Sequence, residues 1–193
     1  ERLFDILKPK VNWRSALRTA LESGLGSKVV TDWRRPGRKN PDMPGVKRLG
    51  IRRGWIMVDC SGSIDKETLS QFAGEVYDIA KRFNVELVVL PWDVEVYDPQ
   101  KVRRPSDIMR VKFKGFGGTE IRKAAEKVAK EMRPLDFVVI LSDGYIWDLR
   151  DSPSEETLNY LARIAARASA AVFVSTIAND LKLPPRWRFI KVD

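Results

Sequence analysis

Five residues with oxygen donors stand at positions where chemistry could occur. They are Asp59, Ser61, Ser63, Thr119 and Asp143. The two aspartates each end an apolar run, and the threonine follows a glycine-rich loop directly before a predicted helix. A hard cation such as Mg²⁺ prefers oxygen ligands in octahedral geometry and keeps waters where the protein leaves positions open. The set therefore predicts a divalent-cation site that could accept a carboxylate from outside, with Mn²⁺ and Ca²⁺ as alternatives to Mg²⁺.

Each of these residues also has a simpler structural explanation. Ser63 and Thr119 could only cap the helices that follow them, and Asp143-Gly144 could only form a turn. Asp59 is harder to explain in this way, because a carboxylate that ends a strand buried on both faces needs a partner. Their joint occurrence at predicted strand ends favours the metal site over these separate roles.

The elements that position these residues alternate along the chain. Apolar runs predict buried strands and stripes at i, i+3 and i+4 predict helices; the order is strand 55–59, helix 69–83, strand 85–92, helix 121–132, strand 137–141, helix 155–168 and strand 171–176. Short edge strands are predicted at 94–97, 109–113 and 188–192. The pattern predicts an α/β fold with a mostly parallel sheet and helices on both faces, where sites lie at the carboxyl ends of the strands.

The chain divides into an N-terminal segment, 1–53, and a domain, 54–193. Residues 1–54 hold 14 Lys/Arg against 5 Asp/Glu, which is the entire net charge of +9. The segment predicts a helix at 11–23 and then a Pro/Gly-rich arm, with one short strand at 28–31, that packs on the domain. Its basic pairs include Arg34, Arg35, Arg38 and Lys39. They could bind nucleic acid or an acidic partner, but arginines that pair with acids of the domain are the favoured explanation, since few aromatics accompany them.

Composition excludes several classes of function. The 193 residues contain no histidine and a single cysteine, Cys60, which removes Ser-His-Asp hydrolysis, disulfide frameworks and most zinc sites. No apolar stretch is long enough for a membrane span, and no signal peptide is visible, so we expect a cytoplasmic protein with no membrane partner. Five Asn and two Gln beside many charged residues are typical of a thermophile.

The three-part pattern Asp59-x-Ser61-x-Ser63, Gly118-Thr119 and Ser142-Asp143-Gly144 resembles the metal-ion-dependent adhesion site (MIDAS) of von Willebrand factor type A (VWA) domains. The resemblance covers residues 54–193 and implies a Rossmann-like three-layer α/β/α fold. It also implies that the hydroxyls of Ser61, Ser63 and Thr119 bind Mg²⁺ or Mn²⁺. The two aspartates would contact the ion directly or through water, and an Asp or Glu of a partner protein would complete the shell.

A narrower resemblance involves the arm. Trp33-Arg34-Arg35-Pro36-Gly37-Arg38, followed by the Asp-x-Ser-x-Ser strand, is similar to a prokaryotic family in which the VWA-like domain follows a predicted zinc-peptidase domain. Such proteins are often encoded beside MoxR-like AAA+ ATPases, which implies an AAA+ partner. This chain has no His-Glu-x-x-His motif, so we expect an interaction module rather than an enzyme. It also lacks a predicted closing helix after the last strand, so another element is expected to cover that face.

Other functions remain as alternatives. An aspartate that ends the first strand also resembles haloacid-dehalogenase-like phosphatases, although Ser61 replaces their second aspartate, which acts as a general acid. A two-metal nuclease would need more carboxylates. Gly118, Tyr145 and Trp147 are candidates for a rim that contacts the partner, whereas Cys60 and Trp92 are better explained as core residues.

Overall fold

The structure, a computed structural model, describes residues 12–25, 29–48, 52–61, 64–110, 119–150 and 152–192. Its centre is a six-stranded sheet with the order β5-β4-β3-β6-β7-β8. The strands are β3 (Arg53–Asp59), β4 (Glu86–Trp92), β5 (Gln100–Val102), β6 (Phe137–Ser142), β7 (Ala170–Ser175) and β8 (Trp187–Lys191). All neighbours pair in parallel except β4 and β5. The predicted α/β fold with a mostly parallel sheet is confirmed.

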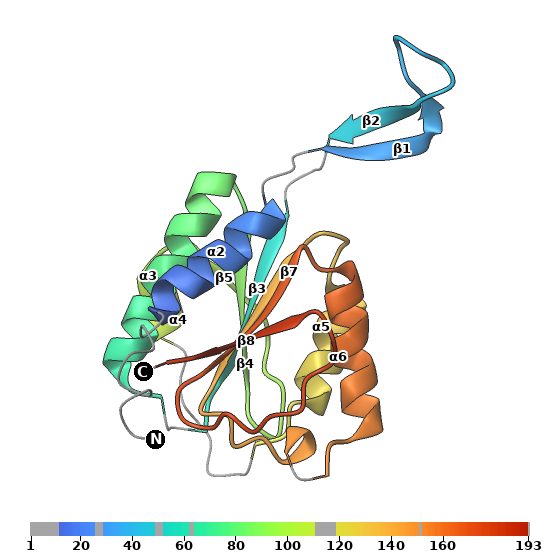
Figure 1. The fold of residues 1–193 in the computed structure, drawn as a ribbon. Helices are drawn as coiled ribbons and strands as arrows, with labels where there is room; N and C mark the ends of the chain where they lie inside the picture. The colour runs from blue at the N-terminus through green and yellow to red at the C-terminus, as the bar shows by residue number, and fades with distance from the viewer. Residues whose placement is uncertain are drawn as a thin grey trace, which may run out of the picture.

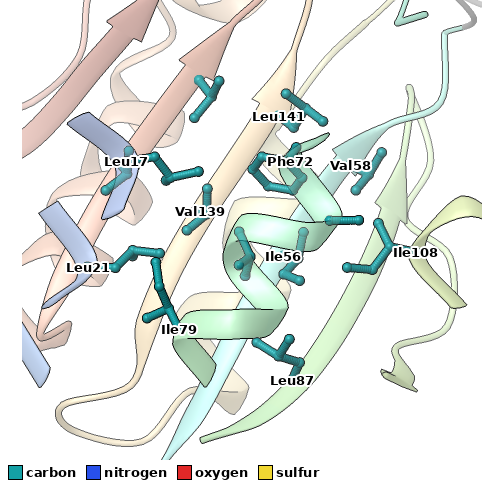
Figure 2. Close-up of a cluster of buried hydrophobic side chains, with 14 of the residues drawn as sticks. Leu17, Leu21, Ile56, Val58, Phe72, Ile79, Leu87, Ile108, Val139 and Leu141 are labelled. Carbon is teal, nitrogen blue, oxygen red and sulfur yellow. The ribbon is translucent and has the colours of Figure 1, made fainter. Parts of the chain in front are cut away.

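Helices cover both faces of this sheet (Figure 1). One face carries α2 (Trp13–Leu25), α3 (Lys66–Phe83) and α4 (Pro105–Met109), and the other carries α5 (Arg122–Glu131) and α6 (Glu155–Arg167). A short 3₁₀ helix, η1 (Trp147–Leu149), lies between β6 and α6. Successive side chains of β3 point to opposite faces: Ile56 and Val58 belong to the core shown in Figure 2, and Trp55 and Met57 to the second core. Burial on both faces explains the unbroken apolar run of β3.

No helix was predicted after the last strand of the sheet. The helix α2 covers the sheet there, against β7 and β8. Its apolar stripe, which includes Leu17 and Leu21, is buried against α3, β7 and β8 (Figure 2). On its flank, Arg14 and Arg18 pair with Glu75 of α3 at 2.5 and 2.6 Å. An N-terminal element therefore takes the covering position, as expected.

The edge strand predicted at 94–97 is wrong, and the start of the one predicted at 109–113 differs from the prediction. Residues 94–97 form only an isolated bridge between Trp92 and Val96, because the Asp93 carboxylate accepts hydrogen bonds from the Glu95 amide and the Tyr97 hydroxyl and so bends the chain. The edge strand is instead β5. Met109 ends the helix α4, which begins at Pro105, where proline favours the first helical turn. The remainder of the strand predicted at 109–113 includes residues outside the described part of the chain.

The basic arm differs most from its prediction. It forms a two-stranded antiparallel hairpin, β1 (Val29–Pro36) and β2 (Pro44–Arg48), that projects from the domain beside the start of β3 (Figure 1). The expectation that the arm packs on the domain is therefore wrong. Pro, Gly and Asn between the strands make a tight connection, in which the Gly37 amide donates to the Met43 carbonyl at 2.7 Å. The two segments consequently satisfy each other's backbone groups instead of those of the domain.

Candidate metal-binding site at the carboxyl edge of the sheet

Asp59 and Asp143 lie together because the sheet reverses its strand order between β3 and β6. β3 pairs with β4 on one side and with β6 on the other, so the carboxyl ends of β3 and β6 are neighbours. Such a switch point is where ligands bind in open α/β sheets. Asp59 ends β3 and Asp143 follows β6 directly. Both are buried, Asp59 with 1% of its surface exposed.

Ser142 links the two carboxylates. Its hydroxyl donates to Asp59 Oδ2 at 2.6 Å and lies 3.5 Å from Asp143 Oδ1. It accepts from the Gly144 amide at 3.0 Å, while the Tyr145 amide donates to Asp143 Oδ1 at 2.9 Å. The sequence pattern contained Ser142 but did not reveal this bridging role, which depends on the β3–β6 register.

Gly144 is required by the turn after Asp143. Its φ is +86°, a conformation that L residues with a Cβ adopt with strain. A Cβ here would also lie 2.7 Å from the Ser175 hydroxyl and 2.9 Å from the Ala178 Cβ. The glycine therefore allows the chain to turn sharply and keeps the Asp143 carboxylate at the edge of the sheet.

The environment of Asp59 disfavours its charged form. Burial raises the pKa of this carboxyl above its usual value, and the neighbouring Asp143 charge adds to the increase. The hydrogen bonds from the Ser142 hydroxyl and the Ser61 amide act in the opposite direction, but they do not cancel the effect of burial on the pKa. A cation between the two carboxylates would remove this penalty, since opposite charge favours ionisation.

The Ser61 hydroxyl is one of four buried side-chain polar atoms without a hydrogen-bond partner among the described residues, and it is the one next to Asp59. It lies next to the Asp59 carboxyl and lowers the pKa of that group. A buried hydroxyl without a partner is costly. Two carboxylates and an unpartnered hydroxyl fit a hard divalent cation.

Thr119 is held at the same edge by backbone hydrogen bonds. Its carbonyl accepts from the Trp147 amide at 3.0 Å, and the amide of Glu120 donates to the Asp93 carbonyl, which follows β4, at 3.3 Å. Thr119 is buried. The structure thus brings the Thr119 segment against the loops that follow β4 and β6. Ser63 and Gly118 lie outside the described residues.

Asp148 is a positioning residue that the sequence did not reveal. It is buried in η1, and its carboxylate accepts from the amides of Ile121 and Arg122 at 3.0 and 3.1 Å and from the Thr157 hydroxyl at 2.6 Å. It therefore caps the start of α5, the helix that follows the Thr119 segment, although Asp148 lies 27 residues after Ile121 in the sequence. Caps are normally sought next to the helix that they stabilise, so no local signal marked it.

Exposed apolar side chains surround this edge. Trp147 is 67% exposed, and Tyr145 and Ile177 are also exposed. Arg150 lies over the Tyr145 ring, 4.9 Å from its centroid. The segment of Ile177 is fixed next to Asp143, whose carbonyl accepts from the Ala178 amide. Tyr145 and Trp147 were predicted as a rim; Ile177 was not, because a single apolar residue in a loop carries no pattern.

Cys60 and Trp92 are core residues, as expected. Both are fully buried, and burial raises the pKa of the Cys60 thiol to about 12. A thiol with so high a pKa is almost entirely protonated near neutrality and is a poor nucleophile. The four predicted arm residues, Arg34, Arg35, Arg38 and Lys39, lie in the hairpin at the opposite end of β3 and take no part in this site.

A family model described as "VWA-like domain (DUF2201)" matches residues 55–179, which is more than half of the chain. The chain belongs to this VWA-like family. The matched range contains β3 to β7 and hence both aspartates of the candidate site. VWA folds commonly mediate protein interactions.

Two further similarities were found. An uncharacterized protein of Thermotoga maritima is 26% identical over 142 residues, which are 74% of this chain but 35% of the relative. The chain thus spans about a third of the length of the relative that it matches. The crystal structure of the SpRpn10 VWA domain aligns with a TM-score of 0.43 and 12% identity, covering 74% of this chain and 88% of that one.

Membrane-spanning helices and clusters of metal-ligating side chains were sought in the part of the chain that the structure describes. No described helix is long and apolar enough to cross a bilayer. No group of three or more Asp, Glu, Cys or His side chains is placed to hold a metal ion there.

Proposed function

We propose that this domain is a Mg²⁺-dependent protein-interaction module that binds an acidic side chain of its partner. The observation that supports the proposal most strongly is the buried Ser61 hydroxyl without a hydrogen-bond partner, next to two carboxylates joined by Ser142. A bound cation would give the hydroxyl a partner and relieve the repulsion between Asp59 and Asp143.

Five residues would hold the ion: Asp59, Ser61, Ser63, Thr119 and Asp143. In a MIDAS-type site the hydroxyls would bind the ion, and the two carboxylates would bind it directly or through water. Two carboxylates balance the charge of a divalent ion, and if one of them binds only through water the ion stays electrophilic and can accept a further negative ligand. An Asp or Glu of the partner would supply it, and no catalytic step is needed for this function.

The surroundings of the site favour a partner with apolar groups next to its acid. Trp147, Tyr145 and Ile177 are exposed at the same edge of the sheet. Aromatic side chains are common among the residues that dominate binding energy at protein interfaces. The resemblance of the arm motif to proteins encoded near MoxR-like AAA+ ATPases supports such an ATPase as the partner.

Isothermal titration with Mg²⁺ and Mn²⁺ tests the metal. The wild type is expected to bind one ion per chain weakly, since the partner's carboxylate is missing. The double variant Asp59→Ala/Thr119→Ala should give no binding heat. Asp78→Asn removes an exposed carboxylate of α3 and serves as a matched control that should bind like the wild type. Equal heats in the wild type and the double variant would refute the site.

The partner is tested by capture on the immobilised domain. An AAA+ ATPase, identified by mass spectrometry, should bind in Mg²⁺ and elute with a chelator. It should not bind to the Asp59→Ala variant. If the same ATPase binds equally in chelator, the interaction exists but does not use the metal, and the proposed mechanism is wrong.

A further inference from the structure

The projecting hairpin has a defined strand register with a β-bulge. Asp32 pairs with Gly45, and the next pair is Pro36 with Pro44, so three residues of β1 have no opposite residue in β2. These residues, Trp33, Arg34 and Arg35, form a bulge. A Cβ at Gly45 would lie 2.6 Å from the Arg35 carbonyl oxygen. The glycine therefore permits the bulge, and bulges commonly reorient side chains for function.

The bulge presents an aromatic ring and positive charge to solvent. Trp33 is 78% exposed and Met43, across the connection, 60%. Arg34, Arg35, Arg38 and Lys39 are all exposed, and within the described residues none of them forms an ion pair. The sequence favoured arginines paired with acids of the domain, and among the described residues no such pair involves these four side chains. Residues 29–48 contain six Lys/Arg against two Asp, so the hairpin carries a surplus of positive charge that these four side chains expose to solvent.

The base of the hairpin is fixed although the hairpin itself projects. Arg52, which follows it, is buried and donates from Nη2 to the Leu25 carbonyl at the end of α2, at 3.0 Å. The carboxylate of Asp136 faces the same region: it favours the charged form of Arg52 and accepts from the Arg53 amide at 2.9 Å. The described residues that flank the hairpin region, Leu25 and Arg52, are thus hydrogen-bonded to each other.

We propose that the hairpin binds single-stranded nucleic acid through the Trp33–Arg35 bulge. Exposed arginines and lysine neutralise phosphates, and an exposed indole between basic residues offers a face on which an unpaired base can stack. A protein partner with an acidic surface would use the same charge, and displacement by poly-glutamate in the test below separates it from a single strand. β3 alone, from Arg53 at the hairpin end to Asp59 at the metal site, is roughly 20 Å long, so the two surfaces are separated by more than the length of this strand.

Fluorescence anisotropy with a labelled oligo-dT of about 20 nucleotides tests the proposal, because several nucleotides can contact a surface of this size. The wild type should bind, and its affinity should fall steeply as salt rises. Arg34→Ala/Arg35→Ala should reduce the slope of log K against log salt by about 1.4, since each phosphate contact on a single strand contributes about 0.7. Trp33→Ala should weaken binding roughly 5- to 150-fold at constant salt with the slope unchanged.

Controls separate this proposal from general charge attraction. Arg163→Ala/Arg188→Ala removes two exposed charges from the body of the domain and should leave affinity and slope nearly unchanged. Circular dichroism and thermal melting verify that every variant is folded. Four results would overturn the proposal: no binding at low salt, hairpin variants that bind like the wild type, a duplex bound as tightly as the single strand, or equal displacement by poly-glutamate. The last result would indicate an acidic protein as the partner.

Discussion

At the scale of single residues, the site combines groups that are unfavourable without a further ligand. Asp59 is buried beside a second carboxylate, and the Ser61 hydroxyl near it has no partner among the described residues. Such arrangements are rare in folded proteins, because buried polar groups normally form hydrogen bonds and buried charges are normally paired. Residues that cost stability and are grouped at a sheet switch point are best explained by binding.

The first prediction concerns Asp59→Asn. In chelator, the amide has no charge to desolvate and does not repel Asp143, so the variant should melt at a higher temperature than the wild type. Excess Mg²⁺ should raise the melting temperature of the wild type, because a ligand that binds only the folded state stabilises it. It should not raise that of the variant. Differential scanning calorimetry measures both, and a variant less stable than the wild type in chelator would contradict the account.

The second prediction concerns Ser142→Ala, which removes the hydroxyl between the two carboxylates. Groups that orient metal ligands typically contribute 10- to 100-fold in affinity, so Mg²⁺ affinity should fall by about that factor. Ser169→Ala is the matched control, since its buried hydroxyl has no hydrogen-bond partner; it should bind Mg²⁺ like the wild type. Titration calorimetry checks both variants, and unchanged affinity in Ser142→Ala would exclude the bridging role.

The sequence predicted the residues of this site better than their interactions. Asp59 and Asp143 were found because a carboxylate at the end of an apolar strand is conspicuous. The bridge through Ser142 and the cap from Asp148 to Ile121 were not predicted, because each depends on which segments become neighbours in the fold. Hydrophobic periodicity indicates which face of a helix or strand is buried, but it does not indicate which other element packs against that face.

At the scale of elements, the attachment of α2 to α3 depends on a buried acid. Burial alone would raise the pKa of Glu75, but hydrogen bonds and ion pairs from Arg18 and Arg14 outweigh it and hold the pKa below its usual value. A lowered pKa in the folded state gives stability that is present above the unfolded pKa and lost as pH falls through the folded pKa.

The third prediction follows for Glu75→Gln. The wild type should lose stability as pH falls through the acidic range, below the ordinary glutamate pKa of 4.5. The variant should be less stable than the wild type at neutral pH and should lose less on acidification, because it has no proton to bind at this position. Urea unfolding at a series of pH values measures the difference. Glu67→Gln, exposed on the same helix, should keep the wild-type pH profile; a Glu75→Gln profile as steep as the wild type would be the contrary result.

Element type was predictable where one pattern dominated. The buried strands and the long amphipathic helices were predicted within a few residues, because their periodicity is uninterrupted. The segment after Asp93 was predicted as a strand, and the short helix that begins at Pro105 was not predicted. In both places local side-chain hydrogen bonds and capping override a short apolar alternation. The hairpin was missed since its strands carry charge and proline instead of an apolar face.

At the scale of the whole molecule, the sheet separates two surfaces. The candidate metal site lies at the carboxyl ends of β3 and β6, and the basic hairpin joins the opposite end of β3 (Figure 1). Residues 29–48, which form the hairpin, contain six Lys/Arg against two Asp, whereas residues 55–193 hold equal numbers of basic and acidic residues. We therefore expect that the two proposed binding activities can be removed independently.

The fourth prediction is that residues 29–48 can be replaced by a short Gly/Ser connector without unfolding the domain. The two strands pair with each other, and α2 and β3 remain joined through Arg52 and Leu25. The melting temperature should change by no more than a few degrees, and the Mg²⁺ response should persist while oligo-dT binding is lost. Thermal melting and anisotropy test this; loss of the Mg²⁺ response would show that the surfaces are coupled.

The most direct test of the central claim is a crystal structure with Mn²⁺, located by its anomalous scattering. The account predicts one strong peak among Asp59, Ser61, Thr119 and Asp143, with the Ser61 hydroxyl bound to the ion at about 2.2 Å, near the distance for small octahedral cations. Saturating Mn²⁺ with no peak at this edge of the sheet, and a Ser61 hydroxyl still without a partner, would contradict it.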